Sequence, residues 1–450
     1  MSNDKTPIIR PLIQRVTLPH FLTRELVKQG IKRFHRITTY GGQDHLPKGE
    51  GPVIFISNHQ NGLMDPMMVS GLLKQQLHWL TRADVFWNPL VRKYLLKCHG
   101  LPIYRQKDRL KDLRERNDVI WDCCIERLNI GAVLSLFPEG NHNPQKTIRG
   151  IKNGLGDLMG RAVSKYESLK SIKIIPLGLD YEDYPDYRRR FCLRMGKPIE
   201  WVDLYDKKTG KVHLKKLAER IQAAMRNIAV DISPYEKYDD IIPYVNALRT
   251  TEASAQGWNK ITCDLDKISQ LGNVMDIADA AEKLRREGFD SGKMRVEAWG
   301  LSNGDVRKKK WWAVALKPLS LIVNAPTFLQ QLILNFKGDN VKSIAFRSTM
   351  KICAGMIVYP LTWTILAAIL GLIASVRGLS FFGWSPFFEV FFTFWSFATF
   401  GNRFYGWLKG HLHDHNDAVE GERFWNDDKS TALREAWVNY IAVVKKTLLE

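Results

Sequence analysis

A histidine and an aspartate separated by five intervening residues are the pair in this sequence best suited to acid–base chemistry. His59 and Asp65 lie in the segment Ser57–Pro66, directly after the apolar run Val53–Ile56. A carboxylate bonded to one imidazole nitrogen orients the ring and makes the other nitrogen a stronger base, able to take a proton from an alcohol. Gly62 permits the tight bend that would return Asp65 to His59. The alternative is structural, because Asp-Pro is also a typical helix start with aspartate as the N-cap.

Charged residues, glycine and proline follow the later apolar runs as well. Arg105 ends the block Gly100–Arg105, and Phe137-Pro138-Glu139-Gly140 follows the next strong run. Arg149 and Lys152 come shortly after that block. Because guanidinium groups bind phosphate through paired hydrogen bonds, Arg105, Arg149 and Lys152 could together clamp a phosphate.

The elements that would position these residues are short apolar strands alternating with helices. Strands are expected at 53–56, 132–137 and 172–177, with helices at 109–128 and 153–164. This alternation predicts an α/β fold, with a mostly parallel sheet flanked by helices, over a catalytic domain at residues 45–205. Ligands of such sheets bind beyond the carboxyl ends of the strands, where His59 stands.

The charge balance and the aromatic residues indicate a membrane partner. The chain carries 66 Lys and Arg against 47 Asp and Glu, a net charge of +19, which would attract a polyanion. Aromatic residues cluster beside apolar runs in the C-terminal third, which favours anionic membrane lipids and argues against nucleic acid. The six cysteines lack metal-type spacing, so no metal site is expected. They are expected to be reduced, which places the soluble part in the cytoplasm.

Two apolar runs predict a membrane hairpin followed by a tail. Transmembrane helices are expected near 352–376 and 379–400, because each run is about long enough to cross a bilayer. Lys and Arg flank both outer ends, so an integral membrane protein with its catalytic domain on the cytoplasmic face is predicted. The other expected regions are an interfacial amphipathic segment at 1–44, a helical accessory region at 206–310, a membrane region at 311–410 and a cytoplasmic tail at 411–450. In that tail, a solvated run is expected for His411, His413, Asp414 and His415.

Four blocks in this order resemble the glycerol-3-phosphate and 1-acylglycerol-3-phosphate (lysophosphatidate) O-acyltransferases. His59 and Asp65 are similar to the first block, Gly100–Arg105 to the second, Phe137–Gly140 to the third and Pro176 to the fourth. The resemblance covers roughly residues 45–205. The family usually has four residues between the histidine and the aspartate, and the five found here are similar to the fungal-type glycerol-3-phosphate/dihydroxyacetone-phosphate acyltransferases.

The resemblance implies a one-step acyl transfer without a cofactor or a metal. Asp65 would orient His59, which would deprotonate a hydroxyl of the acceptor. The alkoxide would then attack the thioester of acyl-CoA or acyl carrier protein. Arg105 would bind the acceptor phosphate, and Glu139 would order the acceptor hydroxyls or Arg105. Backbone groups of the loops at Asn58, Pro138 and Gly140 are expected to stabilise the oxyanion.

One departure from the family pattern leaves the acceptor open. The third block normally continues Thr-Arg-Ser, whereas here Asn141-His142-Asn143 follow Gly140, so that Arg149 or Lys152 would have to compensate for the arginine. The expected function is acyl transfer to glycerol 3-phosphate or lysophosphatidate in phospholipid biosynthesis. A lyso-aminolipid O-acyltransferase and a non-catalytic lipid-binding membrane protein are the alternatives.

Overall fold

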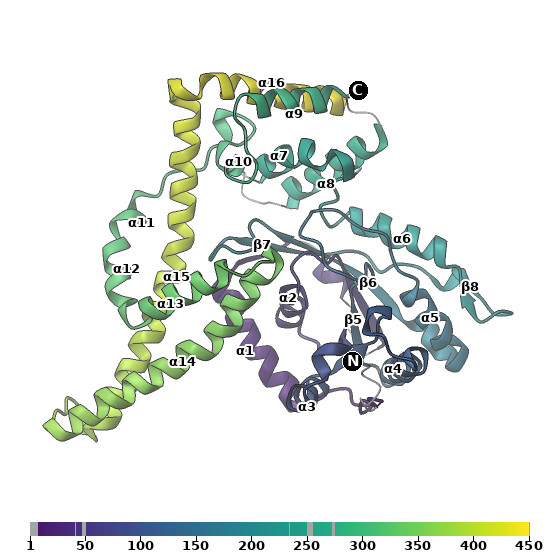
Figure 1. The fold of residues 1–450 in the computed structure, drawn as a ribbon, viewed down its shortest axis with the longest axis horizontal. Coiled ribbons are helices and arrows are strands. Elements are labelled where there is room, and N and C mark those ends of the chain that lie inside the picture. The colour runs from purple at the N-terminus through teal and green to yellow at the C-terminus, as the bar shows by residue number, and fades with distance from the viewer. Residues whose placement is uncertain are drawn as a thin grey trace. The chain divides into compact units, whose positions relative to one another are not determined.

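The chain folds into two compact units. The computed structural model describes residues 8–40, 42–46, 51–233, 235–249, 255–271 and 275–449. Unit 1 comprises Met1–Gln29, Thr39–Asp180 and Cys192–Asp231, and unit 2 comprises Gly30–Thr38, Tyr181–Phe191 and Ile232–Glu450. Figure 1 shows the sheet and its helices in unit 1 and the long helices of unit 2.

A seven-stranded sheet in the order β1-β7-β6-β2-β5-β3-β4 forms the framework of the fold. The central strand β2 pairs in parallel with β5 and β6, and β3 pairs in parallel with β4 and β5. The five residues of β2 are all buried, as expected for a parallel strand covered on both faces. The strands are β1 (Arg36–Tyr40), β2 (Val53–Ser57), β3 (Leu77–Arg82), β4 (Gly100–Ile103), β5 (Val133–Leu136), β6 (Lys173–Tyr181) and β7 (Arg190–Met195).

Helices cover this sheet and complete the core of unit 1. Ile54 of β2, Leu134 of β5 and Ile174 of β6 pack in one buried cluster with Leu128 of α4 and Leu158 of α5. The helices of this part are α1 (Leu18–Phe34), α2 (Met64–Leu72), α3 (Pro89–Lys97), α4 (Leu113–Asn129), α5 (Gly154–Lys165) and α6 (Leu214–Arg226), and a small hairpin adds β8 (Tyr205–Asp206) and β9 (Lys211–Val212). The predicted α/β fold with a mostly parallel sheet is therefore confirmed. The last segment of unit 1 is Cys192–Asp231.

Unit 2 is helical over most of its length. Its helix α16 packs against α8 and α9, with Trp437 buried and its indole N–H bonded to the Gly300 carbonyl at 3.1 Å. Trp299 of α10 stacks on Phe424 of α15 with ring centroids 4.0 Å apart. The helices are α7 (Tyr238–Leu248), α8 (Ala255–Leu271), α9 (Met275–Arg286), α10 (Val296–Trp299), α11 (Trp311–Ala315), α12 (Lys317–Val323), α13 (Ala325–Asp339), α14 (Ile344–Arg377), α15 (Pro386–Asn426) and α16 (Thr431–Leu449).

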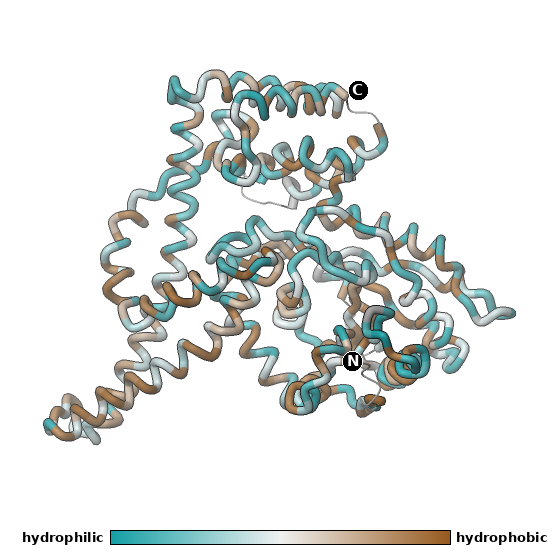
Figure 2. Tube along the Cα trace, viewed as in Figure 1, coloured by the Kyte–Doolittle hydropathy of each residue, from teal (hydrophilic) through white to brown (hydrophobic). Residues whose placement is uncertain are grey.

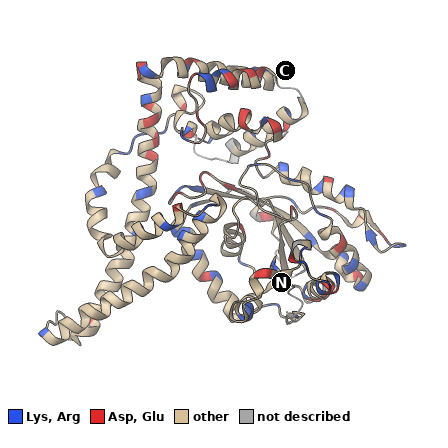
Figure 3. Ribbon diagram, in the orientation of Figure 1, with Lys and Arg blue, Asp and Glu red and all other residues tan. Residues whose placement is uncertain are grey.

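The long helices α14 and α15 pair along an apolar stretch. Figure 2 shows the two helices meeting at an apolar tip, and Figure 3 shows that this paired stretch is almost free of charged residues. In the described part of the chain, α14 is the one helix long and apolar enough to cross a membrane. The pair α12 and α13, bent by 93°, would be a second span if it is counted as one.

One of the two predicted transmembrane segments coincides with a helix that is long and apolar enough to cross a membrane. The expected segment 352–376 lies inside α14. The second expected segment, 379–400, does not coincide with a described helix that could span a bilayer. Helix α15 begins only at Pro386, and Thr, Ser and Trp lower the mean hydropathy of its Phe-rich start before Asn402 and Arg403 follow.

Candidate active site

His59 and Asp65 lie at the carboxyl end of the central strand β2. Nδ1 of His59 is 2.8 Å from Oδ2 of Asp65. The same carboxylate oxygen accepts the backbone N–H groups of Gln60 and Asn61 at 2.7 and 2.8 Å. Asp65 is fully buried in the first turn of α2, whereas His59 keeps 15% of its side chain exposed. The His59 side chain is therefore partly exposed, whereas Asp65 is buried and held by its hydrogen bonds.

This geometry decides which imidazole nitrogen carries the proton. The carboxylate oxygen is an acceptor for the two backbone N–H groups, so the third contact requires Nδ1 of His59 to donate as well. Nε2 of the neutral ring then carries the lone pair and is the basic atom. Asp65 also differs from a helix N-cap, because the N-cap position belongs to Leu63 and the Asp65 side chain points back to the loop before it.

The loop after β5 forms the wall facing this pair. The ring of Phe137 stacks on His59 with centroids 4.1 Å apart, and His142 meets His59 edge-on at 5.6 Å. The backbone N–H of Asn143 donates to the His59 carbonyl at 2.9 Å. The tight turn that leads into this loop ends at Gly140, whose φ of +81° favours glycine over residues with a side chain.

Arg149 and Glu139 form a charged pair beside His59. The Arg149 guanidinium donates to Oε2 of Glu139, to Asn141 and, at 3.3 Å, to the His59 carbonyl. Glu139 is buried, and its other oxygen, Oε1, has no hydrogen-bond partner among the described residues. Burial raises the pKa of Glu139, while Arg149 acts against this. A buried carboxylate oxygen without a hydrogen-bond partner among the described residues thus lies next to the base.

His142 does not supply the positive charge that the family pattern places at this point. Burial and the neighbouring His59 lower the pKa of His142, which keeps its ring neutral at pH 7. The cation beside Glu139 is Arg149, which comes from later in the loop. Lys152 lies against Gly140 through its side chain, since a Cβ on that glycine would be 3.2 Å from the Lys152 Cγ. The structure therefore brings both Arg149 and Lys152 to the Phe137–Gly140 block.

Three residues expected to serve the oxyanion have other partners in this conformation. The Asn58 side chain joins two strands, donating to the Leu179 carbonyl at 2.9 Å and accepting its N–H at 2.8 Å. The Gly140 N–H donates to the Phe137 carbonyl at 3.0 Å, which closes the turn. Pro138 has no N–H, and its carbonyl accepts the Lys152 N–H at 2.8 Å. These residues shape the loops around His59.

Arg105 lies in a second charged group at the neighbouring strand ends. Its guanidinium pairs with Asp108 at 3.1 Å and lies 3.6 Å from Asp84. Arg82, the last residue of β3, also binds Asp84, with its Nε donating to Oδ1 at 2.9 Å. Arg82 also contributes to the lowered pKa of His142, so it lies within electrostatic reach of the site. Sequence reasoning missed Arg82, although its position at the end of the run Leu77–Arg82 was the available signal.

Comparison with known proteins identifies the same region. Residues 37–180 match the family model described as Acyltransferase. The chain is 25% identical over 163 residues to the chloroplastic 1-acyl-sn-glycerol-3-phosphate acyltransferase LPAT1 of Arabidopsis thaliana, which covers 35% of this chain and 43% of that protein. It is 24% identical over 117 residues to glycerol-3-phosphate O-acyltransferase 1 of Saccharomyces cerevisiae, covering 25% of this chain and 15% of that protein. The matches therefore span less than half the length of these relatives.

Among solved structures, the crystal structure of the 1-acyl-sn-glycerophosphate acyltransferase PlsC from Thermotoga maritima is similar, with a TM-score of 0.34 and 16% identity. That similarity covers 46% of this chain and 79% of the other. The family match covers the His59–Asp65 pair, Glu139 and Arg149. Residues 37–180 of the chain therefore match the Acyltransferase family model, in agreement with the resemblance drawn from the sequence blocks.

Proposed function

We propose that this protein is a membrane-bound O-acyltransferase that moves a fatty acyl group from acyl-CoA or acyl carrier protein to a hydroxyl of glycerol 3-phosphate or lysophosphatidate. The observation that carries the proposal is the 2.8 Å contact between His59 Nδ1 and Asp65 Oδ2 at the end of β2. It orients the ring so that Nδ1 donates to Asp65 and Nε2 is left as the basic atom, which is what deprotonation of an alcohol requires. Its preservation despite the fifth intervening residue argues against the non-catalytic alternative.

The acyl group passes directly from the thioester of the donor to the hydroxyl of the acceptor. His59 Nε2 takes the proton of the acceptor hydroxyl as that oxygen attacks the thioester carbonyl. The developing imidazolium is stabilised by Asp65, whose carboxylate is already oriented by the backbone of the loop before α2. When the tetrahedral intermediate collapses, the C–S bond breaks and the thiolate leaves with the proton that His59 returns.

The charged loop suits an acceptor that bears both hydroxyls and a phosphate. Oε1 of Glu139 is a buried acceptor that would bind a hydroxyl of the glycerol backbone. Arg149 and Lys152 supply cationic groups at the same block, and Arg82 and Arg105 add two more at the adjacent strand ends. This concentration of cations favours a phosphate-bearing acceptor over a lyso-aminolipid.

A membrane location is supported by helices that bury polar side chains and expose large apolar ones, the reverse of the pattern in a soluble protein. In α13, Thr327 and Gln331 are buried, while Phe328, Leu329 and Phe336 are exposed. In α14 most of the exposed residues are likewise large and apolar, among them Ile357, Leu361, Ile369 and Ile373. Its buried residues are mostly small or polar, such as Ser348, Gly355, Ala367 and Gly371, together with Ile352 and Trp363. Exposed apolar surface of this extent suits lipid tails, with small residues at the helix contacts.

Orientation follows from the charges that flank this region. Lys337, Lys342, Arg347 and Lys351 lie at the α13–α14 end, and Arg403 and Lys409 follow the apolar start of α15. By the excess of positive charge expected on the cytoplasmic side, these ends face the cytoplasm. We therefore propose an integral membrane protein with its acyltransferase domain on the cytoplasmic face.

An acyl-transfer assay on membranes containing the protein tests the proposal. Labelled acyl-CoA or acyl carrier protein is offered with glycerol 3-phosphate, lysophosphatidate or lyso-aminolipids. We expect acylation of a phosphate-bearing acceptor, reduced between about a hundredfold and ten-thousandfold in His59→Ala. His45→Ala serves as a control, because this half-buried histidine bonds to the Met195 carbonyl. Equal activity of His59→Ala and the parent protein would refute the mechanism, and acylation of lyso-aminolipids alone would refute the acceptor.

A further inference from the structure

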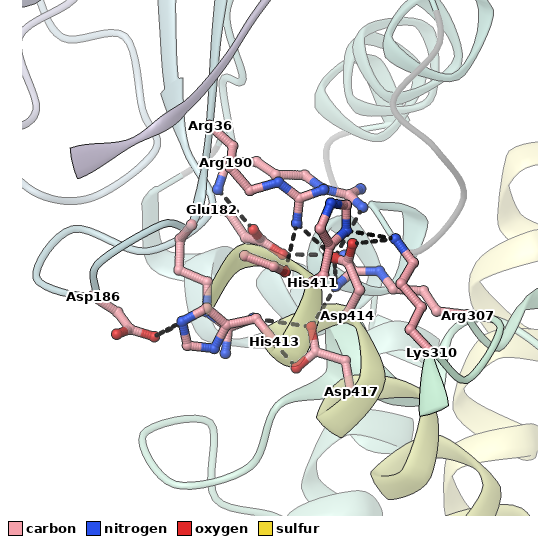
Figure 4. Close-up of polar contacts among 12 residues, drawn as sticks. Arg36, Glu182, Asp186, Arg190, Arg307, Lys310, His411, His413, Asp414 and Asp417 are labelled. Carbon is pink, nitrogen blue, oxygen red and sulfur yellow. Dashed lines mark hydrogen bonds and ion pairs between the residues drawn. The ribbon is translucent and has the colours of Figure 1, made fainter. Parts of the chain in front are cut away.

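A buried group of ions in unit 2 has no part in the proposed chemistry. It joins residues far apart in the sequence: Arg36, the segment 182–190, the segment 295–310 and the segment 411–417 of α15, all of them inside unit 2. Figure 4 shows their side chains converging around Asp414 and Asp417. The expectation that residues 411–415 form a solvated run is wrong here, because His413, Asp414 and His415 are buried.

One side of this ion cluster is balanced, and the side chains of its central members Asp417, Glu182, Arg189 and Arg307 are buried. Asp417 binds Arg307 and, at 3.0 Å, Arg189. Glu182 binds Arg307 at 3.1 Å and lies 3.7 Å from Arg295. Arg189 also binds Asp186 at 3.0 Å, and Arg295 is 3.9 Å from Asp183. Three arginines therefore meet at least as many carboxylates on this side. Such full pairing is what buried charges require.

The other side carries more positive than negative charge. Asp414 accepts Arg36 at 2.7 Å, Lys310 at 2.9 Å and Arg190 at 3.4 Å. Among the described residues, Arg36 and Lys310 have no other carboxylate within ion-pair distance, so these two cations share one anion. Arg190 also faces Glu182, which accepts its backbone N–H at 2.9 Å. The three cationic side chains are also partly exposed, with 21–31% of their surface accessible.

His411 does not change this balance. Its Nδ1 lies 3.2 Å from the Lys310 ammonium, which has only donors, so the ring accepts and is neutral. Burial and the nearby Lys310 and Arg36 lower the pKa of His411, which agrees with a positive potential around it. A partly exposed excess of positive charge attracts an anion from its surroundings.

Tryptophans beside the cluster indicate that it lies near the headgroup level of a membrane. Trp312 packs against Trp407 and His411, with centroids 5.5 and 4.9 Å away, and Trp311 packs against His415 at 4.7 Å. Tryptophan gathers at the headgroup level of membranes because its ring is apolar and its N–H is polar. Asp414 follows Trp407 by seven residues of α15, or about 10 Å along the axis, which places it near the headgroup layer.

We propose that Arg36, Arg190 and Lys310, gathered around Asp414, bind the phosphate of an anionic phospholipid at the membrane surface. The proposal rests on the membrane placement proposed above. It does not depend on acyl transfer, because none of these residues has a role in the proposed reaction. A lipid phosphate would supply the counter-charge that Asp414 alone does not provide, while the acyl chains would lie along the apolar surface of unit 2.

Lipid binding by paired lysine variants tests this site. The full-length protein in detergent is titrated with phosphatidylglycerol and with phosphatidylcholine, and bound lipids are counted by native mass spectrometry. Lys310→Gln is compared with Lys309→Gln, because Lys309 belongs to the same basic run but pairs with Glu422 outside the cluster. We expect about fivefold weaker binding of phosphatidylglycerol in Lys310→Gln and unchanged binding in Lys309→Gln. Equal losses would indicate diffuse attraction and would overturn the site.

A second variant gives a gain instead of a loss. Asp414→Asn removes the internal anion, so the three cations are expected to hold phosphatidylglycerol more tightly than in the parent protein. If the cluster is purely structural, this variant lowers the melting temperature without any gain in lipid binding, and the proposal fails. If the variant does not fold, the comparison of Lys310→Gln with Lys309→Gln decides alone.

Two further arms separate the sources of phosphate and the two proposals. Inorganic phosphate is added without lipid, and an equal rise in melting temperature with phosphate and with phosphatidylglycerol would overturn the lipid assignment. Resistance to alkaline extraction from membranes tests the membrane placement independently. A protein that stays in the membrane but does not distinguish phosphatidylglycerol from phosphatidylcholine refutes this inference and leaves the proposed function standing.

Discussion

Nδ1 of His59 and Oδ2 of Asp65 are 2.8 Å apart, and the same oxygen holds the backbone N–H groups of Gln60 and Asn61. An asparagine at position 65 can place its carbonyl oxygen where Oδ2 now lies and keep all three contacts. It cannot stabilise the imidazolium that forms during the reaction. We therefore expect Asp65→Asn to lower kcat by about a hundredfold or more, with little change in KM for the acceptor.

The measurement is steady-state acyl transfer by membranes with equal amounts of protein. A matching melting temperature for the variant and the parent would show that the loop is intact. A variant that keeps more than half of the parent kcat would contradict the assigned role of the Asp65 charge.

Arg149 is expected to set the lower pH limit of activity through Glu139. Burial already raises the pKa of Glu139, and Arg149 is the largest influence that lowers it. Removing the guanidinium in Arg149→Gln should raise that pKa further, so the ionised carboxylate is lost at a higher pH. The acid limb of the kcat/KM profile is expected to move toward neutral pH, and activity at the optimum to fall by about tenfold.

Arg161→Gln is the matched control for this profile, because Arg161 pairs with Asp118 at 2.7 Å on the surface of the same unit. It should leave both the optimum and the acid limb unchanged. An unshifted acid limb in Arg149→Gln would mean that Glu139 does not act as an ionised acceptor.

The strand-end residues could be predicted from the sequence, whereas their pairings could not. Apolar runs located β2 and β5, and parallel strands bring their carboxyl ends to one edge of the sheet, so His59 and the Phe137–Gly140 block were placed correctly. The strand β3 was missed because His78 interrupts its apolar pattern. That histidine is buried with both ring nitrogens bonded to residues far away in the sequence, Arg127 and the carbonyl of Arg15.

Long-range ion pairs could not be predicted from the sequence either. No local pattern connects Arg36 or the segment 182–190 with Asp414, since the contacts arise only when distant segments pack together. For the same reason the histidines of residues 411–415 were assigned to solvent, although His413 bonds to the Tyr187 carbonyl at 2.9 Å.

A buried group of histidines in unit 1 should make its stability fall at acidic pH. His78 stacks on His99 with centroids 4.0 Å apart, His20 lies 5.1 Å from His99, and Arg127 donates to His78. Burial lowers the pKa of His20 to about 4, of His78 to about 3 and of His99 to about 2. These histidines remain neutral in the folded state at pH values where they would be protonated in the unfolded chain.

The direction follows from that difference in proton binding. Above pH 6.5 both states hold the histidines neutral and the stability is complete. As the pH falls below 6.5, the unfolded chain binds protons first, so the free energy of unfolding decreases. At pH 5 each histidine lowers it by up to about 2 kcal/mol. Melting curves of the detergent-solubilised protein between pH 8 and 5 should show this loss, with a smaller slope in His20→Gln than in His45→Gln. Identical slopes in the two variants would contradict it.

The turn between α14 and α15 depends on Glu389. Its Oε1 accepts the Ser380 hydroxyl at 3.0 Å and the N–H groups of Phe382 and Trp384 at 3.1 and 2.6 Å, and its Oε2 accepts the Phe381 N–H at 2.7 Å. Four donors of the turn thus converge on one side chain. Glu389→Ala removes every acceptor and leaves the backbone N–H groups unsatisfied near the apolar tip, which is strongly unfavourable there.

Glu389→Gln separates the role of these bonds from the role of the charge. The amide oxygen can take the place of Oε1 and keep the three bonds made there, losing only the bond to Phe381. We therefore expect the melting temperature in detergent to fall in the order parent, Glu389→Gln, Glu389→Ala, with the larger step at alanine. If glutamine proved as damaging as alanine, the negative charge itself, and not the hydrogen bonds, would hold the two helices at the turn.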